Sequence, residues 1–441
     1  MGLFKFLFLG LSGYAQSVDK FLETEILVIG GGPAGCAAAI ELVRSGRDVT
    51  IIDKANFPRD KCCGDGLTTD ALRILESMGL KPSTVKNWNE IMNVVIHSPN
   101  GNTIELPLPQ GRGQYAAIVP RTELDERLLD LARDAGTSIQ TPVRFESLRE
   151  LDQHVEVTTS TDRKILARYV IAADGMWSSV RKALGGGIKN YRGDWHAFRQ
   201  YFSETGPEAQ HLRVWFEPDL LPGYMWLFPL PGQRANIGFG VLRGSNYEIG
   251  DLGKLWNNLL ERPHIRNVIG PNAVPEGNRK AWPIPSRLME LLPSKGRIHF
   301  VGDAIGAADP MTGEGIAQAL RTGRLSALAI IKSGPFKPQQ AEAIYKKAIS
   351  AELGHDHQFA GRLQKLLEKS ETAELALQLA NYNDWTRRNF ARWMFEDYPR
   401  ALALTPNRWS SNMFNLDGAY QQSSIKSTGP KEIPQIVMEQ I

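Results

Sequence analysis

Residues 25 to 53 constrain the fold of this chain more than any other stretch. A short apolar run, Ile26 to Ile29, precedes a glycine-rich turn over residues 30 to 35 and a helix of small residues. A second apolar run, Thr50 to Ile52, ends at Asp53. Short apolar runs of this kind are typical of buried strands, and the segment between them suits a crossover helix. The stretch therefore predicts a βαβ unit within a doubly wound α/β domain.

The turn has the spacing Gly-x-Gly-x-x-Gly at Gly30, Gly32 and Gly35. In such a turn the first glycine allows the tight bend, the second lets the backbone approach a pyrophosphate, and the third lets the helix pack on the strand. The helix N-terminus then presents free N–H groups to the phosphates. Asp53 is placed to accept a hydrogen bond from a ribose hydroxyl. Strand, turn, helix and acid together predict a dinucleotide site; the alternative is a generic βαβ turn.

Composition excludes several classes of function. The chain has 441 residues, which suggests two to three domains, and a net charge of +3, which gives no case for nucleic-acid binding. Three cysteines exclude a disulfide framework, and the adjacent Cys62 and Cys63 suit neither an ordinary bridge nor a zinc site. We therefore expect no metal and a reducing, cytoplasmic location.

The first twenty-three residues form a separate extension. Its apolar run, Phe6 to Leu11, is too short to span a bilayer and shorter than the core of a signal peptide. We expect an extension that packs on the first domain or is disordered. Contact with a membrane surface, as a peripheral protein, and secretion are the alternatives.

Two later stretches repeat the pattern of an apolar strand followed by an acid-bearing turn. Tyr169 to Gly175 carries Asp174, and Arg297 to Ala304 carries Gly302 and Asp303. The carboxyl ends of parallel strands meet at one edge of a doubly wound sheet. We therefore expect these two turns and the glycine turn to lie together.

Two further segments are placed to reach the same edge. In the loop after Asp53, Arg59 and Lys61 could meet phosphate, and the following glycines would allow close approach to a flat ring; a surface loop is the alternative. Arg121, where a strand gives way to a helix, could pair either with a phosphate or with Asp125 four residues on.

The remaining chain divides into segments that differ in composition and periodicity. Aromatic residues spread over strand-like segments predict an inserted antiparallel sheet, whose aromatics form either a core or an apolar pocket. Helical periodicity follows, including Ala341 to Leu353 and Phe359 to Ala380, and then a polar tail. The predicted divisions are an extension over 1–23, a cofactor domain over 24–190 and 283–335, a hairpin over 91–107 that joins the inserted sheet, that sheet over 191–282, a helical region over 336–415 and a mobile tail over 416–441.

Together these motifs resemble a known family. The three turns resemble the fingerprints of the FAD-dependent hydroxylase fold of the p-hydroxybenzoate hydroxylase type, over roughly residues 24 to 335. Within it, three stretches are similar to geranylgeranyl reductases and the related menaquinone reductases: the segment from Pro58 to Leu67, the Tyr-x-Trp-x-Phe-Pro motif at Tyr224, and Pro310 to Ile316. Cys62 departs from that pattern as an added vicinal thiol. The Trp-x-Trp-x-Ile-Pro motif of flavin halogenases is absent.

The resemblance implies a Rossmann-like FAD-binding domain and a role for each matching residue. The aromatic side chains of Tyr224, Trp226 and Phe228 would line an apolar substrate channel, and Cys63 or Tyr224 would serve as the catalytic acid. The helix that starts near Ile316 would direct its dipole at the flavin. Residues implied to contact FAD are Gly30, Gly32, Pro33, Ala34, Gly35, Asp53, Lys54, Lys61, Cys63, Gly64, Arg121, Asp174, Gly302, Asp303, Gly313, Gly315 and Ile316.

The activity that the resemblance implies is reduction of carbon–carbon double bonds in a prenyl chain. FAD would take electrons from NAD(P)H or from a reduced carrier protein, and pass a hydride equivalent to one alkene carbon while an acid protonates the other. A monooxygenase or other tailoring enzyme that uses oxygen and a compact aromatic substrate is the alternative. A non-catalytic flavoprotein that scaffolds a partner is a third hypothesis.

Overall fold

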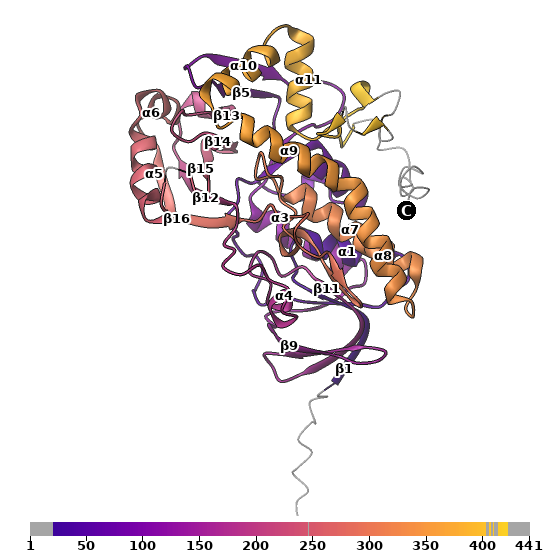
Figure 1. The fold of residues 1–441 in the computed structure, drawn as a ribbon. Coiled ribbons are helices and arrows are strands. Elements are labelled where there is room, and N and C mark those ends of the chain that lie inside the picture. Colours follow the sequence, from indigo (N-terminus) through magenta and orange to yellow (C-terminus); the bar gives the residue numbers. More distant parts are fainter. Residues whose placement is uncertain (1–20, 246, 403–404, 407–408, 410–412, 422–441) are drawn as a thin grey trace, which may run out of the picture.

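The computed structural model of the chain describes residues 21 to 421, apart from 246, 403–404, 407–408 and 410–412. They form two large sheets and a group of C-terminal helices (Figure 1). Most of the extension predicted over residues 1 to 23 lies outside the described residues. Phe21, however, already pairs with Lys164 at the start of β1 (Phe21–Ile29). The first sheet therefore begins three residues earlier than predicted.

The first sheet carries a parallel core in the order β18-β11-β1-β2-β8. Its central strands are buried, which explains their continuous apolar runs. Helix α1 (Pro33–Arg44) packs against α3 (Arg121–Asp134) and α7 (Ile316–Ser333). The remaining strands of this sheet are β2 (Val49–Ile52), β8 (Ser138–Gln140), β9 (Phe145–Glu150), β10 (Val155–Thr159), β11 (Lys164–Ala172), β17 (Ser294–Lys295) and β18 (Ile298–Phe300).

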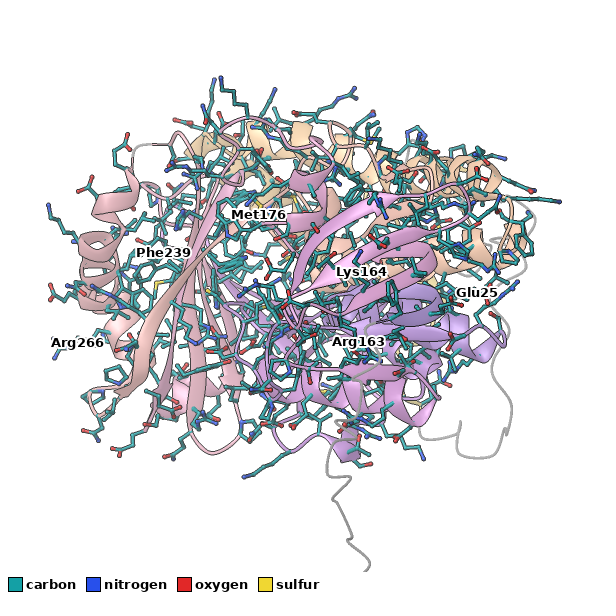
Figure 2. The ribbon with its side chains drawn as sticks, turned by 90° about the horizontal axis from the view of Figure 1, so that it is seen from below. Glu25, Arg163, Lys164, Met176, Phe239 and Arg266 are labelled. Atoms are coloured by element: carbon teal, nitrogen blue, oxygen red, sulfur yellow. The ribbon has the colours of Figure 1, made fainter. Side chains whose placement is uncertain are left out.

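The second sheet has the order β16-β12-β15-β14-β13-β5-β6. The hairpin expected over residues 91 to 107 joins it through parallel pairing of β5 with β13, as Val94 opposite Leu212. In Figure 2, Phe239 lies on this sheet and Lys164 on the first one, at the other side of the molecule. The strands are β5 (Asn93–His97), β6 (Thr103–Pro107), β12 (Trp195–Ser203), β13 (Leu212–Trp215), β14 (Tyr224–Leu230), β15 (Arg234–Leu242) and β16 (Val274–Ile284).

The aromatic residues of the second sheet serve both purposes that the sequence left open. On one face, α5 (Leu252–Glu261) and α6 (Pro263–Ile269) cover a core in which Trp256 stacks near Phe198 and Phe239. Along β14, Met225 and Leu227 belong to that core, whereas the alternate residues Tyr224, Trp226 and Phe228 line a cavity on the other face. The period of two along a strand therefore separates core from pocket.

The C-terminal region is helical, with one break that the sequence pattern concealed. The helix predicted over Phe359 to Ala380 is two helices, because Lys369 takes an extended backbone conformation between them. No helix of the described residues is long and apolar enough to cross a lipid bilayer. The helices are α8 (Pro338–Ile349), a π-helical turn (Ser350–Gly354), α9 (His355–Leu366), α10 (Ser370–Ala380) and α11 (Asp384–Met394).

A mobile tail was predicted over residues 416 to 441, but the start of that range is ordered in the structure. The Gly418 N–H donates to the Arg112 carbonyl, and Ala419 pairs with Gln114 in an antiparallel bridge. Residues 422 to 441 lie outside the described part of the chain. The smaller elements are α2 (Thr69–Met78), α4 (Ser179–Ala183) and a three-stranded sheet of β3 (Gly66–Leu67), β7 (Ala117–Ile118) and β4 (Asn89–Glu90).

Candidate active site

Three strand ends meet at one cavity of about 1210 Å³ that both large sheets line. Gly30 follows β1, Asp174 follows β11, and Gly302 follows β18. Met176, which lines the cavity, lies between the two sheets in Figure 2. This edge is where open α/β sheets bind ligands. Every residue that the sequence singled out for cofactor, substrate or catalysis lines this cavity, with the exception of Gly35.

Gly35 lies behind the cavity and sets how closely α1 approaches β1. A Cβ atom at this position would lie 1.9 Å from the Gly30 carbonyl oxygen. Gly30 itself has φ +114°, and a Cβ there would lie 2.2 Å from the Ala173 carbonyl oxygen. At Gly32, the N-cap of α1, an added Cβ would meet only the end of the Arg59 side chain. The glycine turn therefore holds the backbone tightly on one side and leaves the start of α1 accessible on the other.

The polar groups of the cavity fit FAD. Asp53 Oδ2 accepts from the Gly31 N–H at 2.7 Å and Asp53 Oδ1 from the Ala55 N–H at 2.8 Å, and each oxygen keeps a lone pair for a ribose hydroxyl. Among the described residues, Asp174 Oδ1 and Trp282 Nε1 are buried without a hydrogen-bond partner, and both residues line the cavity. Buried polar groups are normally paired. An acceptor and a donor are thus left for a polar ligand.

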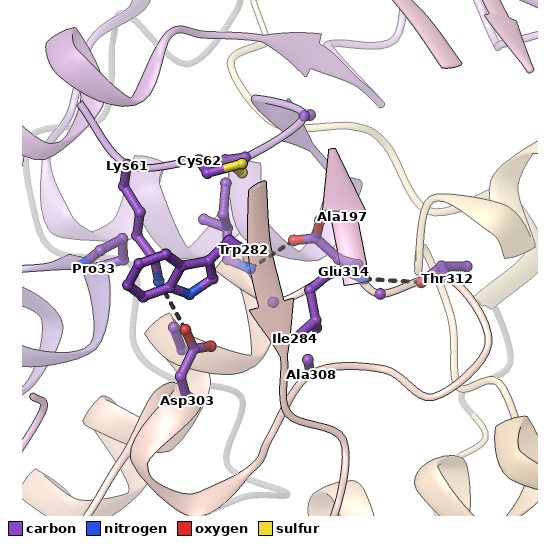
Figure 3. A pocket seen from close by; sticks show the side chains of 18 of the residues that line it. Pro33, Lys61, Cys62, Ala197, Trp282, Ile284, Asp303, Ala308, Thr312 and Glu314 are labelled. Carbon is purple, nitrogen blue, oxygen red and sulfur yellow. Dashed lines mark hydrogen bonds and ion pairs between the residues drawn. The ribbon is translucent and has the colours of Figure 1, made fainter. Parts of the chain in front are cut away.

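Charged side chains from separate segments join around this site. Lys61 Nζ lies 2.7 Å from Asp303 Oδ2, so the loop after β2 is tied to the turn after β18, as Figure 3 shows. Arg121 Nε and Nη2 both donate to Asp125 at 2.7 Å, and Arg59 lies 3.0 Å from the same carboxylate. Burial alone would lower the pKa of Arg121, but the Asp125 charge raises it overall. Of the two partners that the sequence left open for Arg121, the structure shows Asp125.

The loop that carries Cys63 and Gly64 is held to the second sheet by residues for which no role was predicted. Asp65 Oδ2 accepts from the Tyr201 hydroxyl at 2.6 Å and from Asn236 Nδ2 at 2.7 Å. Asn236 Nδ2 also donates to the Cys63 carbonyl at 2.8 Å. Burial raises the pKa of Asp65 to about 6. These contacts hold the loop against β12 and β15; Asn236 had no signal in the sequence, because its partners lie 171 and 173 residues away.

The aromatic residues of β14 form a continuous apolar wall. The ring centroids of Tyr224 and Trp226 lie 6.1 Å apart, and those of Trp226 and Phe228 lie 6.0 Å apart. The Tyr224 hydroxyl donates to the Thr312 carbonyl. Burial raises the pKa of Tyr224 and that of the Cys63 thiol. Both predicted acids therefore hold their protons more tightly than usual.

Glu314 is a carboxyl group in the cavity to which the sequence assigned no role. Its Oε1 accepts from the N–H groups of Ile316 at 2.8 Å and Ala317 at 3.1 Å, at the start of α7. The Glu314 N–H donates to Thr312 Oγ1 at 3.2 Å (Figure 3). Burial raises its pKa to about 7, and the Asp309 charge adds to the shift. The Glu314 charge in turn raises the pKa of both Cys63 and Tyr224, so the three groups share one region. The Gly-Glu-Gly spacing was visible in the sequence, but its burial was not.

The buried pair of Arg121 and Asp125 gives a stability prediction. Asp125→Asn should lower the free energy of unfolding by about 3–5 kcal/mol, because a buried guanidinium would lose its charged partner. Asp130→Asn on the same helix, an exposed carboxylate paired with Arg133, should cost less than about 1 kcal/mol. Urea denaturation of both variants measures the difference. Equal losses in the free energy of unfolding would show that the buried ion pair of Arg121 stabilises the fold no more than the exposed pair does.

Comparison with known proteins agrees with this geometry. Residues 23 to 324 match the family described as FAD binding domain. The menaquinone reductase of Mycobacterium tuberculosis (strain ATCC 25618 / H37Rv) is 33% identical over 350 residues, which cover 71% of this chain and 77% of the relative. Digeranylgeranylglycerophospholipid reductase 2 of Methanopyrus kandleri is 29% identical over 366 residues, which cover 80% of this chain and 89% of the relative.

A solved structure shares the fold. The geranylgeranyl bacteriochlorophyll reductase-like protein of Thermoplasma acidophilum superposes with a TM-score of 0.73 at 21% identity, and the match covers 88% of this chain and 100% of that protein. The fold of this chain is therefore of a known type. The chain belongs to the FAD-binding domain family, and it is an FAD-dependent oxidoreductase related to the menaquinone reductases.

Proposed function

We propose that this flavoprotein reduces isolated carbon–carbon double bonds in the prenyl chain of a quinone or lipid. Its electrons come from NAD(P)H or from a reduced carrier protein. The relatives named above are reductases of menaquinone and of digeranylgeranylglycerophospholipid, which both carry prenyl chains. The proposal applies that substrate class to this chain, and the shape of the cavity supports it.

The observation that carries the proposal is the extent of the cavity. It is lined both by the turns that would hold FAD and by apolar side chains of the C-terminal helices, which cluster with Tyr224 and Phe228. A cavity of this extent suits a long apolar chain better than a compact polar substrate. The apolar residues that α9, α10 and α11 contribute include Phe359, Leu363, Ala373, Ala376, Leu377, Phe390 and Trp393.

Different residues of this chain would hold FAD, position the substrate and donate the proton. The glycine turn and Asp53 would hold FAD, which when bound supplies the hydride equivalent for one alkene carbon. Tyr224, Trp226 and Phe228 would press the prenyl chain against the site and exclude water. Glu314 would donate the proton to the other alkene carbon, so that each double bond gains two hydrogens. Cys63 and Tyr224 remain the alternative acids.

Glu314 suits the role of acid better than the two alternatives. A general acid works best when its pKa lies near the working pH. The pKa of Glu314 is raised to about 7, so the carboxyl is still substantially protonated in neutral solution. The Tyr224 hydroxyl already donates its hydrogen to Thr312, and burial raises the pKa of both Tyr224 and Cys63 from values that were already above 7.

An anaerobic assay tests the proposed function. The FAD-loaded protein is reduced chemically, which removes the question of the natural donor, and is mixed with menaquinone or with digeranylgeranylglycerophospholipid. Recovery of the oxidised flavin absorbance should accompany a gain of two hydrogens per double bond by mass spectrometry. Repeating the reduction step with NADPH, NADH and a reduced ferredoxin identifies the donor.

Two outcomes would replace this proposal. If the flavin stays reduced until air enters and a substrate then gains oxygen, the protein is a monooxygenase. If FAD binds but neither hydrogens nor oxygen are transferred, the scaffold hypothesis stands. A fully saturated isoprenoid alcohol serves as the negative control, because it can occupy the cavity but has no double bond to reduce.

A further inference from the structure

The C-terminal helices expose large apolar side chains close to the cavity. Leu366, Leu375, Leu379, Tyr382 and Trp385 are each 56% to 80% exposed, and we call them the apolar rim. They come from the end of α9, from α10, and from the turn into α11. Scattered exposed apolar residues are normal, but a run of five over twenty residues of sequence, two of them aromatic, marks an interaction surface.

The apolar rim is continuous with the cavity. Leu379 belongs to both, since it is 63% exposed and also lines the cavity. Leu366 precedes Leu367, which lines the cavity, and Leu375 precedes Ala376, which does so too. Leu379 therefore places this part of the cavity wall at the surface, next to the apolar rim. A water-soluble substrate would gain nothing from an entrance with this lining.

Exposed basic residues outnumber exposed acidic residues by one in the segment that carries the apolar rim. The side chains of Arg362, Lys365, Lys369 and Arg388 are exposed there. Exposed acids in the same segment are Glu368, Glu371 and Asp384, the last of which pairs with Arg387. Trp and Tyr favour the boundary between headgroups and acyl chains, and long basic side chains reach back to the headgroups. Aromatic, aliphatic and basic residues thus occur together in the pattern of a helix that lies on a membrane.

We infer that the apolar rim docks on the surface of a lipid bilayer containing anionic lipids and places the cavity mouth against it. A prenyl chain then passes from the bilayer into the cavity without crossing water. The delivery of substrate rests on the proposed function, whereas the docking does not. The rim lies at the end of the molecule opposite the start of β1 (Figure 1), so docking leaves the first sheet facing solvent.

Vesicle flotation of the FAD-loaded full chain tests the docking. The variant combines Leu375→Gln, Tyr382→Gln and Trp385→Gln, none of which lines the cavity. Its partitioning onto vesicles of phosphatidylcholine and phosphatidylglycerol should fall roughly tenfold or more. The matched control combines Leu151→Gln, Val274→Gln and Leu292→Gln, exposed apolar residues elsewhere on the surface, and should partition like the wild type. Vesicles of phosphatidylcholine alone should bind the wild type less tightly.

Activity assays separate this inference from the proposed function. The rim variant should turn over a detergent-dispersed prenyl substrate like the wild type and a vesicle-embedded one more slowly. Equal flotation of wild type and rim variant, or no flotation of the wild type, overturns the inference whatever the reductase assay shows. Rim-dependent flotation without alkene reduction supports docking and refutes the proposed function.

A wild-type dimer that the rim substitutions dissociate would assign the rim to a second copy of the chain and overturn the inference. If the triple variant lacks FAD or native circular dichroism, Tyr382→Gln alone, at a residue 80% exposed, replaces it.

Discussion

Replacing Gly35 by alanine is expected to give a protein that binds FAD far more weakly. The new Cβ would lie 1.9 Å from the Gly30 carbonyl oxygen and 3.1 Å from Val28 Cγ1. Both neighbours belong to the backbone turn or to a buried strand, so neither can move aside cheaply. Helix α1 must shift outward, and the turn at Gly30 and Gly32 must follow. We expect FAD affinity to fall roughly a hundredfold or more, which corresponds to about 2.7 kcal/mol.

The absorbance of the purified protein and a calorimetric titration with FAD measure this effect. Gly361→Ala is the matched control, because Gly361 lies in α9 and an added Cβ there has nothing within 4 Å. That substitution should leave the flavin content unchanged and favour the helix slightly. A yellow Gly35→Ala protein with one FAD per chain would mean that α1 can move without disturbing the cofactor turn, and the tight packing would then have no role in binding.

Replacing Glu314 by glutamine should slow alkene reduction by about 10²- to 10⁴-fold, the usual contribution of a general acid. The introduced side chain would keep an amide oxygen that can accept from the N–H groups of Ile316 and Ala317, so the start of α7 should be preserved. It would have no acidic proton to give. In stopped-flow measurements, reduction of the flavin by its donor should be nearly unchanged, while reoxidation of the flavin by the prenyl substrate should become slow.

The pH dependence gives an independent test of Glu314. Because its pKa is raised to about 7, the proton is retained below that pH and lost above it. The reoxidation rate of the wild type should therefore fall as the pH rises through about 7, and the Glu314→Gln variant should lack this alkaline limb. Glu396→Gln is the control: burial raises the pKa of Glu396 to about 8, yet this carboxyl does not line the cavity. If Glu314→Gln keeps both the rate and the alkaline limb, another group supplies the proton.

Residues whose role depends on one strand and its turn could be predicted locally. The glycine spacing at Gly30, Gly32 and Gly35 follows from the close approach of a helix to a strand, which any βαβ unit of this type requires. Asp174 and Asp303 were placed by the same pattern of apolar strand and acid-bearing turn. Tyr224, Trp226 and Phe228 were placed by the family resemblance alone. Apart from Gly35, which lies behind it, all of these residues line the same cavity in the structure.

Residues whose role depends on burial or on a distant partner could not be predicted. Arg121 had two possible partners, and only the structure shows that its side chain pairs with Asp125. Glu314 was visible as one acid among 48 acidic residues, but only the surrounding sheets and helices remove the water that would otherwise keep its pKa low. The break between α9 and α10 also escaped the sequence, because the apolar spacing continues across it.

The sequence by itself determined the FAD-binding architecture, because a dinucleotide turn is made by neighbouring residues whose spacing alone fixes the backbone. Tertiary structure decided what the rest of the cavity can do. It brought Asn236 to the Cys63 loop, and it set which face of β14 meets the cavity and which meets the core. It also left the apolar rim of α9 to α11 exposed at the cavity mouth. Such relations join residues far apart in the chain, and no local preference of the backbone encodes them.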